Sequence, residues 1–231
     1  MPRRYIQQRR AEQQEETKAR IVEAAVELHN TVGPAHTTDR AIAERAGVTR
    51  RTFYRHFPTD VDLFRACTTH ATQKWPPPDP ATWRGIRDPQ ERLRRGLGEL
   101  YAYYRATGDG LAAILRDGPF LRSELTNLPS RGDVLRTIPA VLMEGWNVRD
   151  RTRAILAAAI VHATSVSTWQ SLVGRQALTQ DEAVSLLVGM VTSAAGPKSK
   201  HRTPGGRQRA ENHSIPRSRS NSAFMRSVSM K

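Results

Sequence analysis

The chain has 231 residues, a formal net charge of +14 at pH 7 and one cysteine, Cys67. A single cysteine excludes an intramolecular disulfide, and the longest apolar run, residues 154–161, is too short to span a bilayer. The N-terminus carries no secretory apolar segment, and no pair of Cys or His has metal-ligand spacing. These features predict a cytoplasmic protein with no cofactor, no metal and no membrane partner.

The positive charge is concentrated at the two ends of the chain. Residues 197–231 hold nine Lys and Arg against one Glu, and residues 1–14 hold four Arg against one Glu. We expect a basic disordered arm over 1–14 and a basic disordered tail over 197–231, because the tail is rich in Ser, Arg, Pro and Gly and poor in apolar residues. The arm is either a solvated terminus or a segment that follows DNA phosphates or enters a minor groove.

Residues 38–57, TDRAIAERAGVTRRTFYRHF, predict two short helices folded around a tight turn. Thr38 or Asp39 caps the first helix, because a short side-chain oxygen can accept from the free N–H groups of the first turn. Gly47 follows that helix, where a positive φ is needed. Thr49 then caps the second helix. The layout is that of a helix-turn-helix (HTH).

Helical phase divides the second helix into two faces. Phe53 and Phe57 are four residues apart and should pack inward, while Arg51 and Arg55 fall on the opposite side. Arg50 stands at the N-terminal end, from which an HTH recognition helix reaches base edges. Arginine there suits guanine, whose O6 and N7 accept its paired donors. Short helix pairs with a glycine corner also occur in proteins that bind no DNA, but a tyrosine on a merely solvated face would be unnecessary.

Residues 17–65 resemble the DNA-binding domain of TetR-type transcriptional regulators (TetR/AcrR). The matching features are Ile21, Ala24, Ala25, Leu28, Gly33, Thr37-Thr38, Ile42-Ala43, Ala46-Gly47-Val48, Thr52-Phe53-Tyr54, His56-Phe57 and Leu63. By this resemblance, the residues that reach bases are Arg40, Arg50 and Arg51. The residues that touch the DNA backbone are Thr38, Thr49, Thr52, Tyr54 and His56.

One position departs from the family pattern. Many relatives have a lysine at the start of the fourth helix, where it contacts phosphate, and this chain has Asp60. Aspartate complements the dipole of a helix N-terminus but repels phosphate. Either the hydroxyl of Thr59 takes over the contact, or this edge of the domain stands further from the duplex.

A proline-rich stretch, residues 75–89, separates the predicted HTH domain (15–75) from a larger helical domain (76–196). The predicted fold is all-α, with an N-terminal three-helix HTH domain and a larger helical ligand-binding and dimerisation domain. The helices expected in the second domain cover 91–106, 108–116, two or three pieces of 121–146, 150–173, and 179 or 180–195.

The last two predicted helices carry apolar stripes that need a partner. The first stripe contains Ile155, Ala159, His162, Val166, Trp169 and Val173, and the second contains Ala183, Leu186, Leu187, Met190 and Val191. The two helices could pair inside one subunit or dock on a symmetry mate in a four-helix interface. The resemblance favours a homodimer, and reading an operator with two half-sites about 34–36 Å apart requires two copies of the HTH.

The middle helices should enclose an apolar pocket for a small hydrophobic effector. The candidate lining residues are Tyr101, Tyr104, Leu111, Leu115, Phe120, Leu142, Trp146, His162 and Trp169. An aromatic stripe at helical spacing is also what an ordinary core looks like, and a histidine on an apolar face is often a core residue. By the resemblance, an effector in this space changes the separation of the two HTH domains. The effector and the operator then weaken each other's binding by the same factor.

The sequence thus favours a ligand-responsive homodimeric transcriptional regulator that binds a palindromic double-stranded DNA operator. Because regulators of the TetR type are usually repressors, the resemblance implies a repressor. The alternative is a constitutive architectural DNA-binding protein that relies on its basic ends and has no effector. An enzyme is not expected, because no nucleophile elbow, P-loop, dinucleotide fingerprint or metal motif is present in the sequence.

Overall fold

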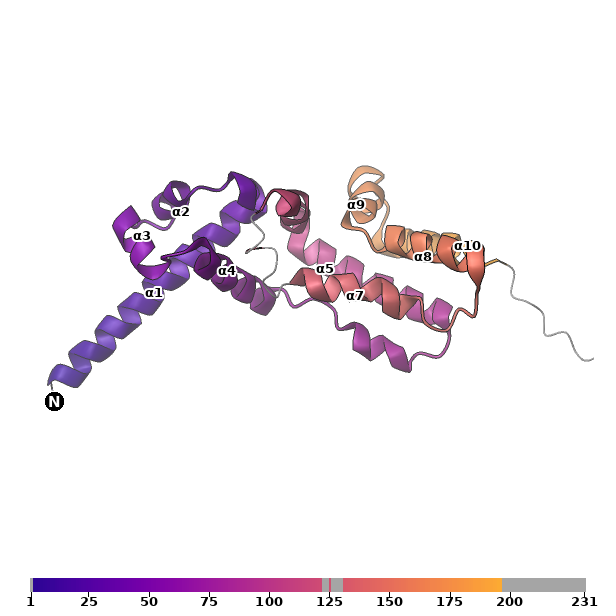
Figure 1. Ribbon diagram of the computed structural model, residues 1–231, viewed down its shortest axis with the longest axis horizontal. Coiled ribbons are helices and arrows are strands. Elements are labelled where there is room, and N and C mark those ends of the chain that lie inside the picture. Colours follow the sequence, from indigo (N-terminus) through magenta and orange to yellow (C-terminus); the bar gives the residue numbers. More distant parts are fainter. Residues whose placement is uncertain (1, 122–124, 126–130, 197–231) are drawn as a thin grey trace, which may run out of the picture. The chain divides into compact units, whose positions relative to one another are not determined.

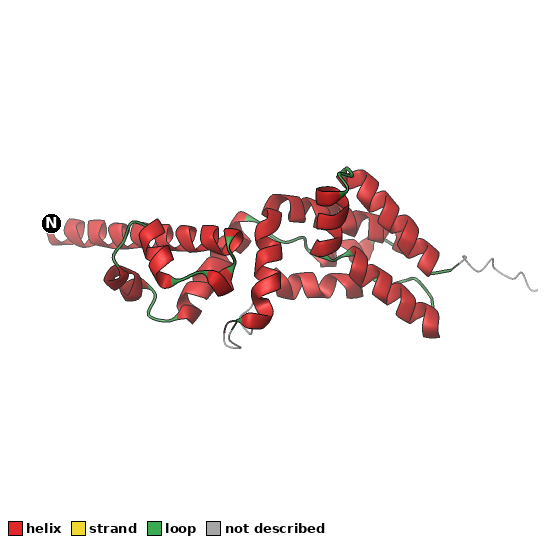
Figure 2. Cartoon of the chain, turned by 90° about the horizontal axis from the view of Figure 1, so that it is seen from above, coloured by secondary structure: helices red, strands yellow, loops and turns green. Residues whose placement is uncertain are grey.

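The computed structural model describes residues 2–121, 125 and 131–196, so the tail predicted to be disordered lies outside the described residues. Every regular element in the described part of the chain is a helix, and this part contains no strand (Figure 2). The all-α prediction is confirmed. No helix among the described residues combines the length and apolar character that crossing a bilayer requires.

The first part of the chain consists of a long helix followed by four shorter elements. These are α1 (Pro2–Thr31), the 3-10 turn η1 (Pro34–His36), α2 (Asp39–Arg45), α3 (Arg50–His56) and α4 (Asp60–Lys74). Both α2 and α4 pack against α1 (Figure 1). Their shared apolar cluster includes Ile21, Ala25, Ile42, Phe53, Phe57, Leu63 and Cys67, all buried.

Residues 2–14 extend α1 and do not form the disordered arm that the composition predicts. The segment after Pro2 holds no Pro or Gly and is rich in Gln, Glu, Arg and Ala, which are good helix formers. Residues 5–16 are exposed, with one exposed aromatic ring, that of Tyr5, lying under the guanidinium of Arg9 at 5.9 Å. The basic N-terminal residues are therefore presented on a helix.

The proline-rich stretch contains no α-helix before Pro89, where α5 begins, and its regular element is the 3-10 helix η2 (Pro80–Gly85). The buried guanidinium of Arg92 holds this stretch in place. Its acceptors are the backbone carbonyls of Trp83 at 3.2 Å, Ile86 at 2.5 Å and Glu144 at 2.6 Å. One side chain thus donates to three carbonyls, of which that of Trp83 also accepts from the backbone N–H of Ile86 at 3.0 Å.

The next elements are α5 (Pro89–Asp117), η3 (Gly118–Phe120) and α7 (Arg131–Leu142). The two predicted helices 91–106 and 108–116 are the halves of α5, which is interrupted at Gly108 by φ 59° and ψ −151°. Pro139 lies inside α7, where a break was expected. The helix continues because one missing backbone hydrogen bond is outweighed by burial of the residues around it in the core.

The C-terminal elements are α8 (Asp150–Ala163), α9 (Val166–Trp169), the π-helical turn η4 (Gln170–Arg175) and α10 (Gln180–Ala194). The single helix predicted over 150–173 is therefore wrong.

Side chains from α5 account for the end of α8. The hydroxyl of Tyr101 donates to the carbonyl of Ala163 at 3.1 Å, and that of Tyr104 donates to the carbonyl of Thr164 at 2.6 Å. These carbonyls would otherwise lack partners where the helix stops. Ser165 then caps α9 by accepting from a backbone N–H. Because the tyrosines lie some 60 positions earlier in the chain, periodicity within 150–173 carries no trace of the break.

The larger core lies among α5, α7, α8 and α10, with α10 packed on both α5 and α8. Its most deeply buried side chains include Trp83, Leu93, Leu97, Tyr101, Ile138, Leu142, Leu156, Ile160 and Val188. The described residues thus form two apolar clusters, one within residues 21–67 and one that begins at Trp83, although both lie in one compact unit. We retain the domains 15–75 and 76–196 as a proposal on the basis of these clusters.

Candidate functional site

Three threonines fix the helix starts around the predicted HTH. The Oγ1 atoms of Thr38, Thr49 and Thr59 each accept from a backbone N–H three residues later, at 3.2, 3.1 and 3.2 Å. Gly47 has φ 65° and forms the corner between α2 and α3. The predicted caps and the predicted end of the second helix at His56 are confirmed. The corner is thus specified by local rules of capping and turn geometry.

Two phenylalanines anchor α3 to the rest of the domain. Phe53 and Phe57 are each 2% exposed, and their ring centroids lie 6.2 Å apart. The opposite face, which carries Arg50, Arg51 and Tyr54, is exposed. Burial of the two rings therefore determines which side of α3 faces outward.

The exposed face of α3 is connected to the first turn of α2 by a polar network. Arg50 donates from Nη2 to the hydroxyl of Tyr54 at 3.3 Å, and its guanidinium lies 5.7 Å from the centre of the Tyr54 ring. The hydroxyl of Tyr54 donates to Oδ2 of Asp39 at 2.9 Å. These contacts hold the Arg50 side chain along the helix, and they raise the pKa of its guanidinium.

The remaining predicted DNA contacts differ in exposure. Thr38, Arg40, Thr49 and Arg51 are exposed, and the guanidinium of Arg40 donates to Glu44 at 2.8 Å. Thr52 is half-buried.

His56 is also half-buried, and its Nε2 is buried without a hydrogen-bond partner among the described residues. Burial, with smaller effects from Arg55 and Lys18, lowers the pKa of His56. The His56 ring lines a cleft with side chains of α1 and α4, and Arg50 and Arg51 do not line that cleft. The phosphate contact assigned to His56 by resemblance remains a prediction, as do the other contact roles.

The geometry around Asp60 bears on the departure from the family pattern. Asp60 is exposed at the start of α4. The hydroxyl of Thr59 accepts from the backbone of Asp62 and donates to the Asp62 carboxylate at 2.7 Å. The Thr59 hydroxyl is thus already engaged within its own helix, which favours the interpretation that this edge stands away from the duplex.

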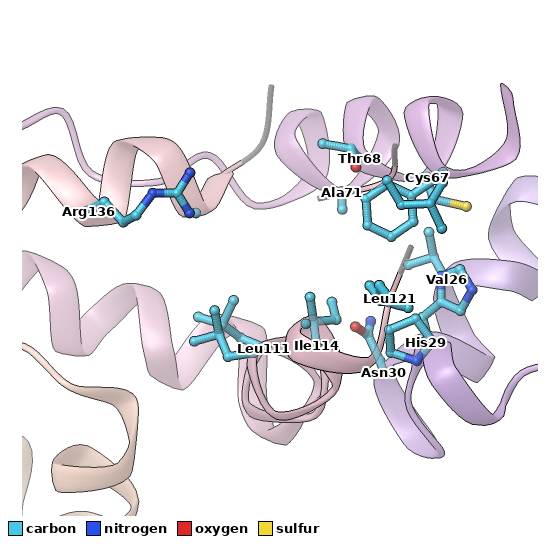
Figure 3. Close-up of a pocket in the computed structure, with 16 residues that line it drawn as sticks. Val26, His29, Asn30, Cys67, Thr68, Ala71, Leu111, Ile114, Leu121 and Arg136 are labelled. Carbon is cyan, nitrogen blue, oxygen red and sulfur yellow. The ribbon is translucent and has the colours of Figure 1, made fainter. Parts of the chain in front are cut away.

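An apolar pocket of about 350 Å³ lies among α1, α4, α5 and α7 (Figure 3). In Figure 3, Val26, His29 and Asn30 come from α1, while Cys67 and Thr68 face them from α4. The other lining residues are Pro34, Phe64, Ala71, Leu111, Ile114, Leu115, Gly118, Leu121, Leu125, Gly132 and Arg136. We call this cavity the apolar pocket.

The nine residues predicted to line an effector pocket are not brought together. Leu111 and Leu115 line the apolar pocket, and Tyr104 and Leu115 line a neighbouring groove. Phe120 is 79% exposed and His162 is exposed.

The other predicted pocket residues are core or lie elsewhere. Tyr101 and Leu142 are fully buried in the larger core. Trp169 is half-buried with its ring centroid 6.0 Å from that of Tyr104, and Trp146 lines a separate cavity near the start of α8. Tyr101, Tyr104 and Trp169 therefore belong to the packing of α5 against α9 and the end of α8.

Sequence reasoning missed the contribution of α1 and α4 to the apolar pocket. Cys67 is buried in α4, and it lines the cavity together with Phe64 and Thr68 of the same helix. Burial raises the pKa of the Cys67 thiol to about 12, so the thiol stays protonated and unreactive at neutral pH. Burial also lowers the pKa of His29 to about 4, which keeps its imidazole neutral.

A close contact joins the end of α5 to the connection between α1 and α2. Asp117 is 1% exposed and accepts from the backbone N–H of Ala35 at 3.1 Å and from the guanidinium of Arg116 at 2.8 Å. These bonds, that of Arg116 first, lower the pKa of Asp117. Gly33 allows the approach, since a Cβ there would lie 2.1 Å from Oδ2 of Asp117. The pocket-lining end of α5 is thus bonded to the segment that leads into the HTH.

Helices α8 and α10 expose large apolar side chains on the side away from the core. Ile155, Val161, Leu186 and Met190 are 45–56% exposed, whereas Leu156 and Ile160 are buried. On α10 the predicted stripe is divided, because Ala183, Leu187 and Val191 pack inward while Leu186 and Met190 do not. The two helices therefore pair within the subunit and still present an apolar outer face.

No group of three or more His, Cys, Asp or Glu side chains suited to holding a metal ion occurs in the part of the chain that the structure describes.

Comparison with known proteins gives a family match over the HTH segment. Residues 21–67 match the family model of bacterial regulatory proteins of the tetR family. Comparison with curated protein sequences finds no match.

Several solved structures share the fold. A tetR-family transcriptional regulator from Streptomyces coelicolor is 23% identical, with a TM-score of 0.52 over 78% of this chain and 80% of that one. NalD, the secondary repressor of the MexAB-OprM multidrug efflux pump in Pseudomonas aeruginosa, is 20% identical, with a TM-score of 0.51 over 79% and 97% of the two chains. A TetR-like transcriptional regulator from Rhodococcus sp. RHA1 is 18% identical, with a TM-score of 0.50 over 78% and 97%. At these identities the likeness concerns the fold.

Proposed function

We propose that this chain is a TetR-type homodimeric repressor that releases a palindromic operator when a small hydrophobic effector binds, since residues 21–67 match the family model of bacterial regulatory proteins of the tetR family. The observation that carries the DNA-binding part is the exposed cationic face of α3. Arg50 and Arg51 stand at its N-terminal end, and buried Phe53 and Phe57 fix the orientation of that face. A short helix held in this way can present guanidinium groups to guanine edges in a major groove.

The outer face of α8 and α10 supports the proposed homodimer. Large apolar side chains at about half exposure lie on two adjacent helices, and Leu186 and Met190 share one face of α10; exposed apolar surface of this kind is what soluble proteins cover with a partner. A second copy related by a two-fold axis would bury the same residues on both subunits. Two antiparallel helix pairs would then make a four-helix interface.

The apolar pocket supports the proposed effector response. Its walls include α4, which follows α3 directly, and the second half of α5, which ends at the Asp117–Ala35 hydrogen bond. An occupant that prefers a different spacing of these helices would shift the population of HTH orientations. The effect on operator affinity is limited by the difference in effector affinity between the two states.

The experiment that tests the proposal is a nuclease footprint on the DNA flanking the gene for this chain, with and without a panel of small hydrophobic compounds. We expect protection of two half-sites separated by one or more helical turns, lost when an effector is added. Replacing Arg50→Ala should raise the protein concentration needed for the footprint, while the matched control Arg87→Ala, which removes an equal charge from an exposed site outside α3, should leave that concentration unchanged. Equal loss with both variants would contradict the proposed role of α3.

Deletion of residues 197–231 distinguishes the repressor from the constitutive architectural binder. A repressor that reads DNA through α3 should keep its footprint after the deletion. A protein that relies on its basic ends should lose most of its DNA affinity, because that affinity comes from neutralised phosphates and is strongly salt-dependent.

A further inference from the structure

The apolar pocket adjoins a second cavity. This cavity, which we call the polar groove, has a volume of about 760 Å³ and is lined by parts of α5, α7 and α9. Four residues line both cavities: Asn30, Leu115, Gly132 and Arg136. A single molecule can therefore occupy the apolar pocket and reach the polar groove at these residues.

Both cavities have apolar walls, and the polar groove adds more uncharged polar groups to them. Phe64, Leu111 and Ile114 are among the apolar walls of the pocket. The groove instead collects hydroxyl and amide groups, and these come from Thr164, Ser165, Ser167 and Gln170. Such a gradient fits a ligand with an apolar body and a polar head.

The charged side chains that line the cavities favour an anionic head. Arg116 and Arg136 are the charged residues among the described lining residues of the two cavities, and no carboxylate is among them. Arg136 pairs with Asp133 one helical turn away, and its side chain remains 69% exposed. A guanidinium has five N–H donors in a fixed fork, so one carboxylate neighbour leaves donors for a second carboxylate.

Resting on the proposed effector response, we infer that the effector is a lipophilic monocarboxylate whose apolar body fills the apolar pocket and whose carboxylate binds Arg136 where the two cavities meet. A single shared arginine matches a single negative charge, whereas phosphate groups are recognised by clusters of arginines. The neutral His29 adds no second positive charge in the pocket. The body supplies affinity through apolar burial, and the head supplies selectivity.

Calorimetric titration of the full-length protein without DNA tests the inference, using decanoate below its micellar concentration, decan-1-ol and acetate as probes. Decanoate should bind saturably and more tightly than decan-1-ol, and acetate should not bind. Arg136→Met should weaken decanoate binding by about ten- to a hundredfold, the usual worth of a hydrogen-bonded charge, and leave decan-1-ol unchanged. The matched control Arg94→Met, at an exposed arginine of α5 that lines neither cavity, should change neither.

A second variant tests the place of the apolar body. Thr68→Leu adds volume to the pocket wall and should weaken decanoate and decan-1-ol alike, with circular dichroism confirming that the variant is folded. Equal binding of decanoate and decan-1-ol to the unmodified protein would overturn the inference, and so would the absence of saturable binding. Neither result touches the operator footprint of the ligand-free protein, so failure of this inference and failure of the proposed DNA binding are distinguishable.

Discussion

Replacing Gly33→Ala tests the contact between α5 and the HTH most directly. Gly33 has φ 96° and ψ 151°, a region of backbone conformation that is essentially restricted to glycine. The added Cβ would lie 2.1 Å from Oδ2 of Asp117 and 2.6 Å from Nη2 of Arg116. The substitution therefore strains the backbone and forces the buried Asp117 away from the N–H of Ala35.

The expected loss of stability follows from these two effects. Backbone strain at such a position contributes about 1–3 kcal/mol, and overpacking at a tight contact contributes about 1–3 kcal/mol. The reduced entropy of the unfolded chain offsets about 0.4–1 kcal/mol. The free energy of unfolding should thus fall by about 2–5 kcal/mol, a large fraction of the total for a domain of this kind.

Urea unfolding followed by circular dichroism measures this loss, and Gly47→Ala is the matched control. Gly47 also has a positive φ, 65°, but no atom lies within 4 Å of the position of an added Cβ. The free energy of unfolding of the Gly47→Ala variant should fall by about 1–2 kcal/mol, because alanine is strained in the left-handed conformation. If both variants lose the same amount, the close approach of Asp117 to Gly33 contributes nothing and the reasoning is refuted.

Four further predictions concern other parts of the molecule. Arg50→Ala should weaken operator binding by about 1–3 kcal/mol and relax preference at one base pair, whereas Tyr54→Phe should weaken all sites evenly; equal losses on random DNA, measured by fluorescence anisotropy, would contradict these roles. Met190→Glu should shift the protein from dimer to monomer in sedimentation equilibrium, because a charge would enter the outer face of α8 and α10, and an unchanged mass would remove this face from the proposed interface. Arg92→Met should lower the free energy of unfolding by about 3–5 kcal/mol, since it leaves the carbonyls of Ile86 and Glu144 without their donor; a loss below about 1 kcal/mol in urea would show that these hydrogen bonds of Arg92 are dispensable. The pKa of His29 is about 4 in the folded chain against an ordinary 6.5, so the unfolded chain takes up the proton at a higher pH than the folded chain. The free energy of unfolding should therefore fall as the pH drops from 6.5 towards 4, by up to about 3 kcal/mol. In His29→Phe the free energy of unfolding should depend less on pH over this range, and an unaltered pH dependence would assign the effect to other groups.

The parts of the fold that could be predicted from sequence are those set by local rules. Thr38, Gly47 and Thr49 act on backbone groups within four residues of themselves, so their spacing was sufficient to place α2 and α3. The burial of Phe53 and Phe57 followed from helical phase in the same way. The orientation of α3, and with it the candidate DNA-reading face, therefore follows from the order of residues within this short segment.

The parts that escaped prediction depend on contacts between distant positions. The end of α8 is set by the hydroxyls of Tyr101 and Tyr104, and periodicity assigned those two residues to an effector pocket. The apolar pocket uses α1 and α4, whose stripes look the same whether they meet a neighbouring helix or a cavity. The extension of α1 over residues 2–14 was missed because charge and polarity suggested disorder, although the helix propensity of the same residues was favourable.

The interruption at Gly108 gives α5 a pivot. The half of α5 before Gly108 packs in the larger core through Leu97 and Tyr101. In the half after Gly108, Gly110 lies against Asn30 of α1, and the helix ends at Asp117, which bonds to Ala35. Because glycine tolerates both signs of φ, rotation about this one residue can swing the second half of α5 while leaving the first half seated. A small displacement of the residues beside Gly108 would then rotate the HTH helices α2 and α3 through the hydrogen bond between Asp117 and Ala35, and no helix of the subunit would have to unfold.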